Sequence, residues 1–318
     1  MNPYVFIVGC PRSGTTLLQR MINAHRQIAV MPEAPWIYQF LEGTGIGSGG
    51  VVKDDLIPAL LNQAKFARLG ITRDQALSLI GENQPETYST FVRKIFDLYG
   101  EMQGKKLVGN KTPGLVRRLE VVHRLWPEAR IIHVIRDGRD VFLSMKNRPL
   151  HNWDSEAHTG WKEDPVSAVA LWWELSVRMG QKAAKMLGSR LYLAIRYESL
   201  VLQPEHECAA LCAFLGLPYD GAMLRFHEAF ARKSPNAGGK HDKQPITPGL
   251  RNWRTEMLAE EVEPFEAAVA ALLNELGYAR AFPNPSLEFV ENSARRRSLL
   301  LGKAARYARV LERAEVRT

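Results

Sequence analysis

A buried strand, a tight glycine turn and a helix follow one another near the start of the chain. The run is Phe6-Ile7-Val8-Gly9-Cys10-Pro11-Arg12-Ser13-Gly14-Thr15-Thr16-Leu17-Leu18. Glycine at positions 9 and 14 lets the backbone turn sharply and approach a ligand closely. The first free amides of the helix, together with the helix dipole, then form an anion site. This pattern predicts that Ser13, Gly14, Thr15 and Thr16 bind a phosphate, unless the glycine pair is a chance feature of an ordinary strand–turn–helix corner.

Short apolar runs alternate with helical patterns along the chain, which is typical of a parallel sheet with helices on both faces. The expected strands are Tyr4–Gly9, Lys105–Gly109, Arg130–Ile135 and Arg190–Arg196. The expected helices are Gly14–His25, Gly114–Trp126, Arg139–Lys146, Pro165–Leu187, Pro204–Leu215 and Thr255–Leu276. The alternation predicts an α/β protein with a P-loop-type three-layer fold, in which helices flank a central parallel sheet.

The 318 residues favour one domain over residues 1–290, with a helical insertion near residues 50–100. Residues 291–318 form a basic tail with helical spacing. From Ala294 onward the tail has eight basic and two acidic residues, so it carries six of the eight net positive charges of the chain. The nearly neutral body argues against nucleic-acid binding. The tail is either a solvated helix or an amphipathic helix on the inner face of a membrane.

Three cysteines, Cys10, Cys208 and Cys212, indicate reduced thiols and a cytoplasmic protein, because their number is odd and the last two share a helical stretch. No apolar run approaches the ~20 residues of a membrane span. No histidine or cysteine cluster has the spacing of metal ligands, so no metal is expected. The sequence leaves the oligomeric state open.

A second anion signal lies in the run Ile131–Met145. Arg136 ends a buried strand, where a parallel sheet presents its ligand crevice. Ser144 follows about two helical turns later and can return to that crevice. A guanidinium and a hydroxyl suit a terminal phosphate. Asp137 and Asp140 either join this site or cap the helix and pair with Arg139, whereas His133 is expected in the core.

The first loop differs from that of nucleotide triphosphatases, because Thr15 stands where their lysine should be and Arg12 supplies the charge instead. This difference weakens the alternative of a P-loop nucleotide kinase-like phosphotransferase that binds Mg-ATP.

Two segments, in this order along the chain, resemble the two signatures by which sulfotransferases bind 3′-phosphoadenosine 5′-phosphosulfate (PAPS). The first is Pro11-Arg12-Ser13-Gly14-Thr15-Thr16, and the second is Arg136-Asp137-Gly138-Arg139 with Ser144. The chain is most similar to the tyrosylprotein sulfotransferase-like branch and its bacterial relatives. The likeness extends to Asn110-Lys111-Thr112-Pro113 and Arg196-Tyr197-Glu198-Ser199-Leu200. It covers residues 4–205, and more weakly Lys243–Trp253.

The resemblance implies a sulfotransferase that moves the sulfuryl group of PAPS to an acceptor hydroxyl and releases adenosine 3′,5′-bisphosphate, with no metal required. It implies that Arg12 holds the 5′-phosphosulfate, that Arg136 and Ser144 hold the 3′-phosphate, and that Lys111 lies near the transferring group. It also implies that Glu33 is the general base. The helix before Glu33 departs by about 15 Å and the next eight residues span up to about 26 Å, so Glu33 can return to the loop. Otherwise Glu33 is a solvated loop carboxylate.

Further cofactor contacts are expected from Tyr197 at the adenine, and from Lys243, Arg251 and Trp253 in the segment that closes over the 3′-phosphate. Each has a structural alternative: Tyr197 and Trp253 as packing aromatics, and Lys243 as a solvated charge. The acceptor could be a sugar, a glycolipid, a small alcohol or a tyrosine. Ala34 stands where the tyrosine-specific branch has a second acidic residue, which weighs against protein tyrosine. A nucleotide-binding module without catalysis is the remaining alternative.

Overall fold

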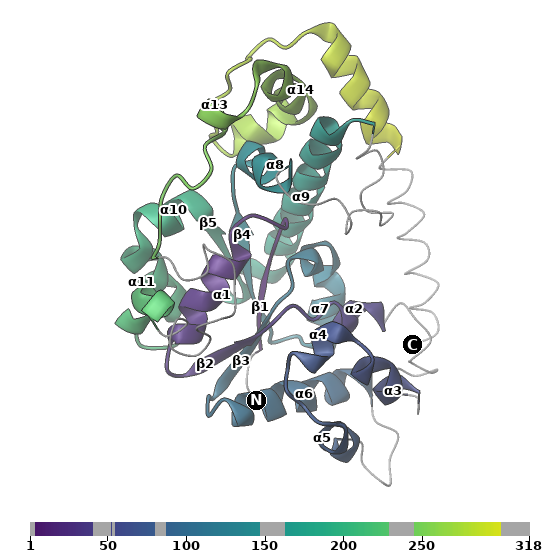
Figure 1. Ribbon diagram of the computed structural model, residues 1–318, viewed down its shortest axis with the longest axis vertical. Helices are drawn as coiled ribbons and strands as arrows, with labels where there is room; N and C mark the ends of the chain where they lie inside the picture. Colours follow the sequence, from purple (N-terminus) through teal and green to yellow (C-terminus); the bar gives the residue numbers. More distant parts are fainter. Residues whose placement is uncertain are drawn as a thin grey trace.

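The computed structural model describes residues 4–40, 52, 55–79, 87–146, 163–228 and 245–299, and within them five parallel strands form one sheet (Figure 1). The strands are β1 Val5–Gly9, β2 Ile28–Met31, β3 Leu107–Lys111, β4 Arg130–Ile135 and β5 Tyr192–Arg196. Their spatial order is β2-β3-β1-β4-β5. The first strand lies in the middle, so the chain builds the sheet outward on both sides of it and leaves a ligand crevice at its carboxyl end.

Alternation along β1 divides the core into two layers. Phe6 and Val8 face one side of the sheet, while Val5 and Ile7 face the other, and all four are fully buried. Helices α1, α10 and α11 cover the Val5 side, and α6, α7 and α9 cover the Phe6 side (Figure 1). The predicted three-layer α/β fold is therefore confirmed.

The described helices have the following bounds: α1 Thr15–Ala24, α2 Trp36–Gln39, α3 Leu56–Leu61, α4 Ala64–Ala67, α5 Arg73–Ser78, α6 Tyr88–Met102, η2 Pro113–Arg118, α7 Leu119–Leu125, α8 Gly138–Lys146, α9 Pro165–Leu191, α10 Tyr197–Leu202, α11 Pro204–Leu215, η5 Gly221–Arg225, α13 Trp253–Glu256 and α14 Ala259–Glu275. A further helix covers residues 287–299. Helices α8, α9, α13 and α14 enclose a separate apolar cluster at one end of the sheet.

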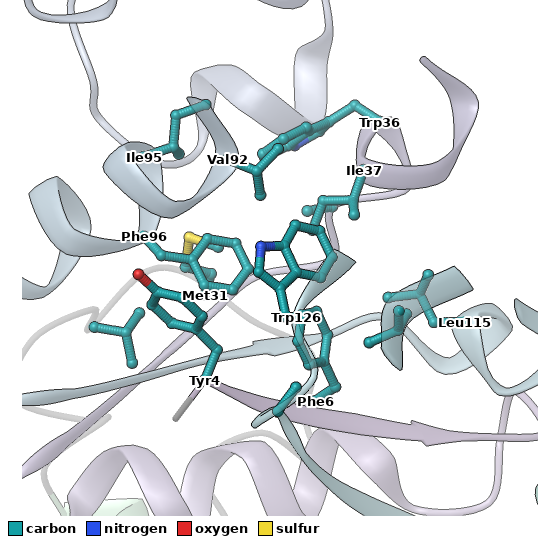
Figure 2. Close-up of a cluster of buried hydrophobic side chains, with 14 of the residues drawn as sticks. Tyr4, Phe6, Met31, Trp36, Ile37, Val92, Ile95, Phe96, Leu115 and Trp126 are labelled. Carbon is teal, nitrogen blue, oxygen red and sulfur yellow. The ribbon is translucent and has the colours of Figure 1, made fainter. Parts of the chain in front are cut away.

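Aromatic side chains fill the layer between the sheet and the inserted helices (Figure 2). The ring of Trp126 stacks on Phe6 at 5.5 Å and on Phe96 at 6.3 Å between centroids. Tyr4 meets the same Phe96 edge-on at 5.0 Å. This cluster fixes helix α6, and with it the insertion, against the sheet.

The structure differs from the expected elements in four places. Strand β2 was missed, because a four-residue apolar run at the sheet edge is not distinguishable from a connection without its partner β3. Strand β3 extends to Lys111 rather than Gly109, since the polar side chain of Asn110 is buried in a hydrogen bond with another loop. The expected helix Gly114–Trp126 begins as the 3-10 helix η2, and the expected helix Thr255–Leu276 is split into α13 and α14.

The basic tail contacts the body where it is described. Arg296 pairs with Asp164 at 2.9 Å, and Arg297 pairs with Glu174 of α9 and donates to the carbonyl oxygen of Ala268. Cys10, Cys208 and Cys212 are free and buried. Among the described residues, no helix is both long enough and apolar enough to cross a bilayer.

Candidate active site

The carboxyl ends of all five strands contribute to one site. The loop after β1 carries Arg12, the segment after β2 carries Glu33, β3 ends with Lys111, Arg136 follows β4, and Tyr197 follows β5. All of these except Lys111 line one pocket, and Lys111 contacts Glu33 at its wall. The other residues of the pocket wall are Pro11, Gly14, Thr15, Thr16, Leu17, Arg20, Pro113, Ser144, Phe226, Pro245, Ile246, Thr247 and Leu250. The topology thus brings together residues that are up to 239 positions apart in the sequence, from Pro11 to Leu250.

The loop after β1 has the strained backbone of an anion cradle. Arg12 is the one described residue other than glycine with a positive φ, 78°, and Gly14 follows with a φ of 94°. The amide of Ser13 donates to the carbonyl oxygen of Cys10 at 3.1 Å and closes the turn. The buried Oγ of Ser13 has no hydrogen-bond partner among the described residues. Such a hydroxyl has the properties of a ligand donor, because burying it without a partner is unfavourable.

Arg136 is held from three directions. Its guanidinium lies 4.2 Å from the ring centroid of Tyr197, and the indole nitrogen of Trp173 donates to its carbonyl oxygen at 2.9 Å. The next amide, that of Asp137, donates to Glu198 at 2.9 Å. The buried Nε of Arg136 has no partner within the described part of the chain. A cation fixed in this way is preorganised for an anion in the pocket.

A direct hydrogen bond joins the two predicted phosphate sites. The Nε of Arg12 donates to the Oγ of Ser144 at 3.0 Å, across 132 residues of sequence. Tyr197 adds a second link, since its ring lies under Arg136 and packs against the backbone of Gly14. The two segments that the sequence suggests separately therefore lie side by side at one pocket.

The segment that carries Glu33 is fixed by strand β3. The side-chain amide of Asn110 donates to the carbonyl oxygen of Pro32 at 3.0 Å. The amide of Ala34 donates to the Oγ1 of Thr112 at 2.8 Å. Asn110 and Thr112 thus hold the backbone on both sides of Glu33, while Lys111 between them reaches its carboxylate. This geometry explains why the three polar residues are consecutive.

Two lysines contact Glu33. The Nζ of Lys111 lies 2.8 Å from Oε1, and the Nζ of Lys65 lies 2.9 Å from Oε2. Partial burial raises the pKa of the Glu33 carboxyl, but the charges and hydrogen bonds of Lys111 and Lys65 outweigh this effect and lower it to about 2. Burial lowers the pKa of Lys111, and attraction to Glu33 partly restores it. Lys111 also donates to the Oγ1 of Thr16 at 3.3 Å, so it links the carboxylate to the phosphate loop.

The two aspartates after Arg136 have structural roles. Asp137 accepts hydrogen bonds from the backbone and side chain of Arg139, as the structural alternative predicted. Asp140 accepts from the amide of Trp253 at 2.9 Å and lies 3.5 Å from Arg136. Burial raises the pKa of Asp140 to about 6, although Arg136 opposes this. His133 is fully buried in the core, as expected, and shares a 2.5 Å hydrogen bond with the hydroxyl of Tyr192.

The closing segment is described only in part. Lys243 lies outside the described residues, and Arg251 is partly exposed and donates to the carbonyl oxygen of Leu250. The role of Arg251 at the 3′-phosphate stays a prediction. Trp253 is buried against the guanidinium of Arg139, at 3.6 Å from its ring centroid, so it packs in the core rather than lining the pocket.

Several residues at the site were not assigned a role from the sequence, among them Asn110, Thr112, Lys65 and Phe226. Asn110 and Thr112 flank Lys111 in a segment that carries the family resemblance, so their position in the sequence could have indicated that they belong to the site. Lys65 and Phe226 gave no such signal, because Lys65 contacts Glu33 from a helix of the insertion and Phe226 lines the pocket from the segment just after η5.

The Sulfotransferase family matches residues 3–221 of the chain. Protein-tyrosine sulfotransferase A of Caenorhabditis elegans is 26% identical over 286 residues, which are 87% of this chain and 67% of that protein. Nodulation protein NoeE of Sinorhizobium fredii is 28% identical over 87% of this chain and 66% of its own length. The protein-tyrosine sulfotransferase of Drosophila melanogaster is 25% identical, and the matched region is 52% of its length. The chain therefore spans between half and about two thirds of these relatives.

Solved structures share the fold. The sulfotransferase domain of the olefin synthase of Synechococcus PCC 7002 aligns with a TM-score of 0.56 at 22% identity, covering 87% of this chain and 95% of that domain. The sulfotransferase domain from the curacin biosynthetic pathway aligns with a TM-score of 0.54 at 18% identity, covering 88% of this chain and 99% of that domain. With the family match over residues 3–221 and the site geometry, these likenesses confirm the resemblance seen in the sequence: the chain belongs to the sulfotransferase family.

Proposed function

We propose that this sulfotransferase uses PAPS as its donor and transfers the sulfuryl group in line to an acceptor hydroxyl, with Glu33 as the general base. The observation that carries the proposal is that Arg12, Ser144, Arg136 and Glu33 line one pocket, with Lys111 in contact with Glu33. The orphaned polar atoms of Ser13 and Arg136 fit phosphate oxygens. The arrangement supports a donor with two phosphate groups and a reacting end at Lys111.

In the proposed reaction, the acceptor oxygen forms a bond to sulfur while the bond from sulfur to the bridging oxygen of the donor breaks. Glu33 takes the proton of the acceptor hydroxyl. Arg12 and Lys111 stabilise the charge that develops on the departing phosphate oxygen, and adenosine 3′,5′-bisphosphate leaves. Positioning and electrostatic stabilisation carry most of the rate enhancement in transfers of this kind.

Lys111 would change partners during this cycle. Without donor it holds Glu33, whose pKa of about 2 makes it a weak base. A negatively charged sulfuryl group near Lys111 would compete with Glu33 for the ammonium. Because partial burial alone raises the pKa of Glu33, the loss of this contact would make the carboxylate more basic when the donor is in place.

The acceptor class is a hydroxyl compound. Two relatives are named for protein tyrosine, so a tyrosine phenol is one candidate beside a sugar, a glycolipid and a small alcohol. We further propose a cytoplasmic location, supported by the odd number of cysteines, and contact of the basic tail with the inner face of a membrane.

The test measures release of adenosine 3′,5′-bisphosphate from PAPS with a panel of tyrosine peptides, sugars, glycolipids and simple phenols as acceptors. We expect acceptor-dependent release with at least one class, and loss of release in Glu33→Gln with donor binding retained. Tight donor binding without release for any acceptor would favour the non-catalytic nucleotide-binding module. Release that is unchanged in Glu33→Gln would refute the assignment of the base.

A further inference from the structure

Lys65 is a second cation at the proposed general base. It lies on the short helix α4, and its Nζ is 2.9 Å from Oε2 of Glu33, whereas Lys111 takes Oε1. Each carboxylate oxygen therefore has its own ammonium partner. Glu33 and Lys65 are 32 residues apart, and none of the sequence motifs includes Lys65.

The position of Lys65 is built into the fold. The next residue, Phe66, is 1% exposed and meets the indole of Trp36 edge-on at 5.6 Å between centroids. Trp36 begins helix α2 three residues after Glu33. The hydroxyl of Tyr88, at the start of α6, donates to the carbonyl oxygens of Trp36 and Ile37. Figure 2 shows Trp36 beside Val92 of α6. Apolar packing and hydrogen bonds, as well as the ion pair, thus hold the insertion against the segment that carries Glu33.

The two lysines have different surroundings. Lys111 is buried in the sheet, with a side-chain exposure of 6%, and it also contacts Thr16 of the phosphate loop. Lys65 has a side-chain exposure of 40%, and it approaches Glu33 from the insertion. Lys111 is thus placed to move its ammonium group to a bound donor, and Lys65 is placed to keep its contact with the Glu33 carboxylate. Among the described residues, the charged groups that line this pocket besides Glu33 are Arg12 of the phosphate loop, Arg20 of helix α1 and Arg136 after β4.

We propose that Lys65 is a positioning residue for Glu33: it keeps the carboxylate ionised and aimed into the pocket when Lys111 turns to the sulfuryl group of the donor. The inference rests on the proposed function, because it assumes that PAPS draws Lys111 away. Through Lys65 the helical insertion takes part in the reaction without touching the transferring group.

Proton linkage gives a test that needs no acceptor. Partial burial raises the pKa of Glu33 and the two lysines lower it. If the donor removes Lys111 and a mutation removes Lys65, both contacts that lower the pKa of Glu33 are lost, and burial then favours protonation of the carboxyl at mildly acidic pH. With Lys65 in place, one cation remains and the uptake is small.

The experiment is calorimetric titration of PAPS into the full chain at pH 5.5, in two buffers of different ionisation enthalpy, which yields the number of protons bound with the donor. Lys65→Gln removes the charge, and Lys65→Arg keeps it. The control Arg68→Gln removes the same charge from an exposed residue next to the same short helix. The double variant Lys65→Gln/Glu33→Gln removes the group that would take up the proton.

We expect proton uptake on the order of several tenths in Lys65→Gln. Uptake should be close to the wild-type value in Lys65→Arg, in Arg68→Gln and in the double variant. Equal uptake in Lys65→Gln and wild type would overturn the inference, as would an increase that persists in the double variant. Failure of PAPS to bind the wild-type protein is a different result, and it would contradict the proposed function instead.

Discussion

Glycine at position 14 is required by the packing of Tyr197 as well as by the turn. A Cβ added at Gly14 would lie 2.3 Å from Cδ2 and 2.7 Å from Cε2 of the Tyr197 ring. The ring cannot move away freely, because its face supports the guanidinium of Arg136 at 4.2 Å. The substitution Gly14→Ala must therefore displace the phosphate loop, the ring or both.

Two costs add in this variant. Overpacking a tight site costs about 1–3 kcal/mol. A side chain at the positive φ of 94° costs about 1–2 kcal/mol more. We expect the free energy of unfolding to fall by about 2–5 kcal/mol. Affinity for adenosine 3′,5′-bisphosphate should fall on the order of tenfold or more, since a shift of Tyr197 moves Arg136.

Urea unfolding and calorimetric titration measure the two effects. The matched control is Gly104→Ala, because Gly104 also has a positive φ, 62°, but no described atom lies within 4 Å of the added Cβ. It should show the backbone cost alone and normal nucleotide affinity. Tyr197→Ala should remove most of the overpacking cost of Gly14→Ala in a double-mutant cycle. Additive effects of the two substitutions, or a Gly14→Ala variant that matches the control, would refute the reasoning.

Three further predictions concern the groups that support the site. Glu266→Ala should lower the free energy of unfolding by about 3–5 kcal/mol, because the buried guanidinium of Arg139 loses its ion pair with Glu266. Urea unfolding measures this change, with the exposed Glu260→Ala as the control, and equal stability of the two variants would contradict it. Thr112→Val leaves the amide of Ala34 without its acceptor, so kcat should fall while donor affinity stays unchanged in calorimetry; an unchanged kcat would show that the clamp does not position Glu33. Burial lowers the pKa of His133 to about 3, below its ordinary value near 6.5. Between these two values the unfolded chain binds a proton at His133 that the folded chain does not. The free energy of unfolding should therefore fall as the pH drops below about 6.5, by up to about 1.4 kcal/mol per pH unit. Urea unfolding of the wild type and His133→Gln between pH 7.5 and 5 should show the steeper loss in the wild type, and equal slopes would exclude His133 as the cause.

The sequence predicts the donor side of the site well because its signals are local. A strand, a turn and a helix occupy consecutive residues, so the loop around Arg12 and Gly14 is specified by its own sequence. Arg136 is predictable for a related reason, since the end of a buried parallel strand must face the crevice. The hydrogen bond between Arg12 and Ser144 follows once both strands lie side by side in the sheet.

The acceptor side depends on contacts between distant segments. The role of Glu33 was predicted from the family resemblance and from the length of chain available to bring it back to the phosphate loop. Strand β2, which brings the chain back to this end of the sheet, was missed. The hydrogen bonds of Asn110 and Thr112 to the backbone on both sides of Glu33 depend on the register of β2 against β3, and no local sequence pattern predicts this register. Lys65 reaches Glu33 because Phe66 packs on Trp36, a contact between an insertion and a loop that sequence spacing does not reveal.

The central claim is that the pocket binds an adenosine with phosphates at both its 3′ and 5′ ends. Calorimetric titration of adenosine 3′,5′-bisphosphate in the presence of EDTA, compared with ATP and magnesium, tests it most directly, with Arg136→Ala measured alongside. We predict tight binding of the bisphosphate without metal, a large loss of affinity in Arg136→Ala, and much weaker binding of Mg-ATP. Magnesium-dependent ATP binding with little affinity for the bisphosphate would contradict the account and favour a kinase-like phosphotransferase.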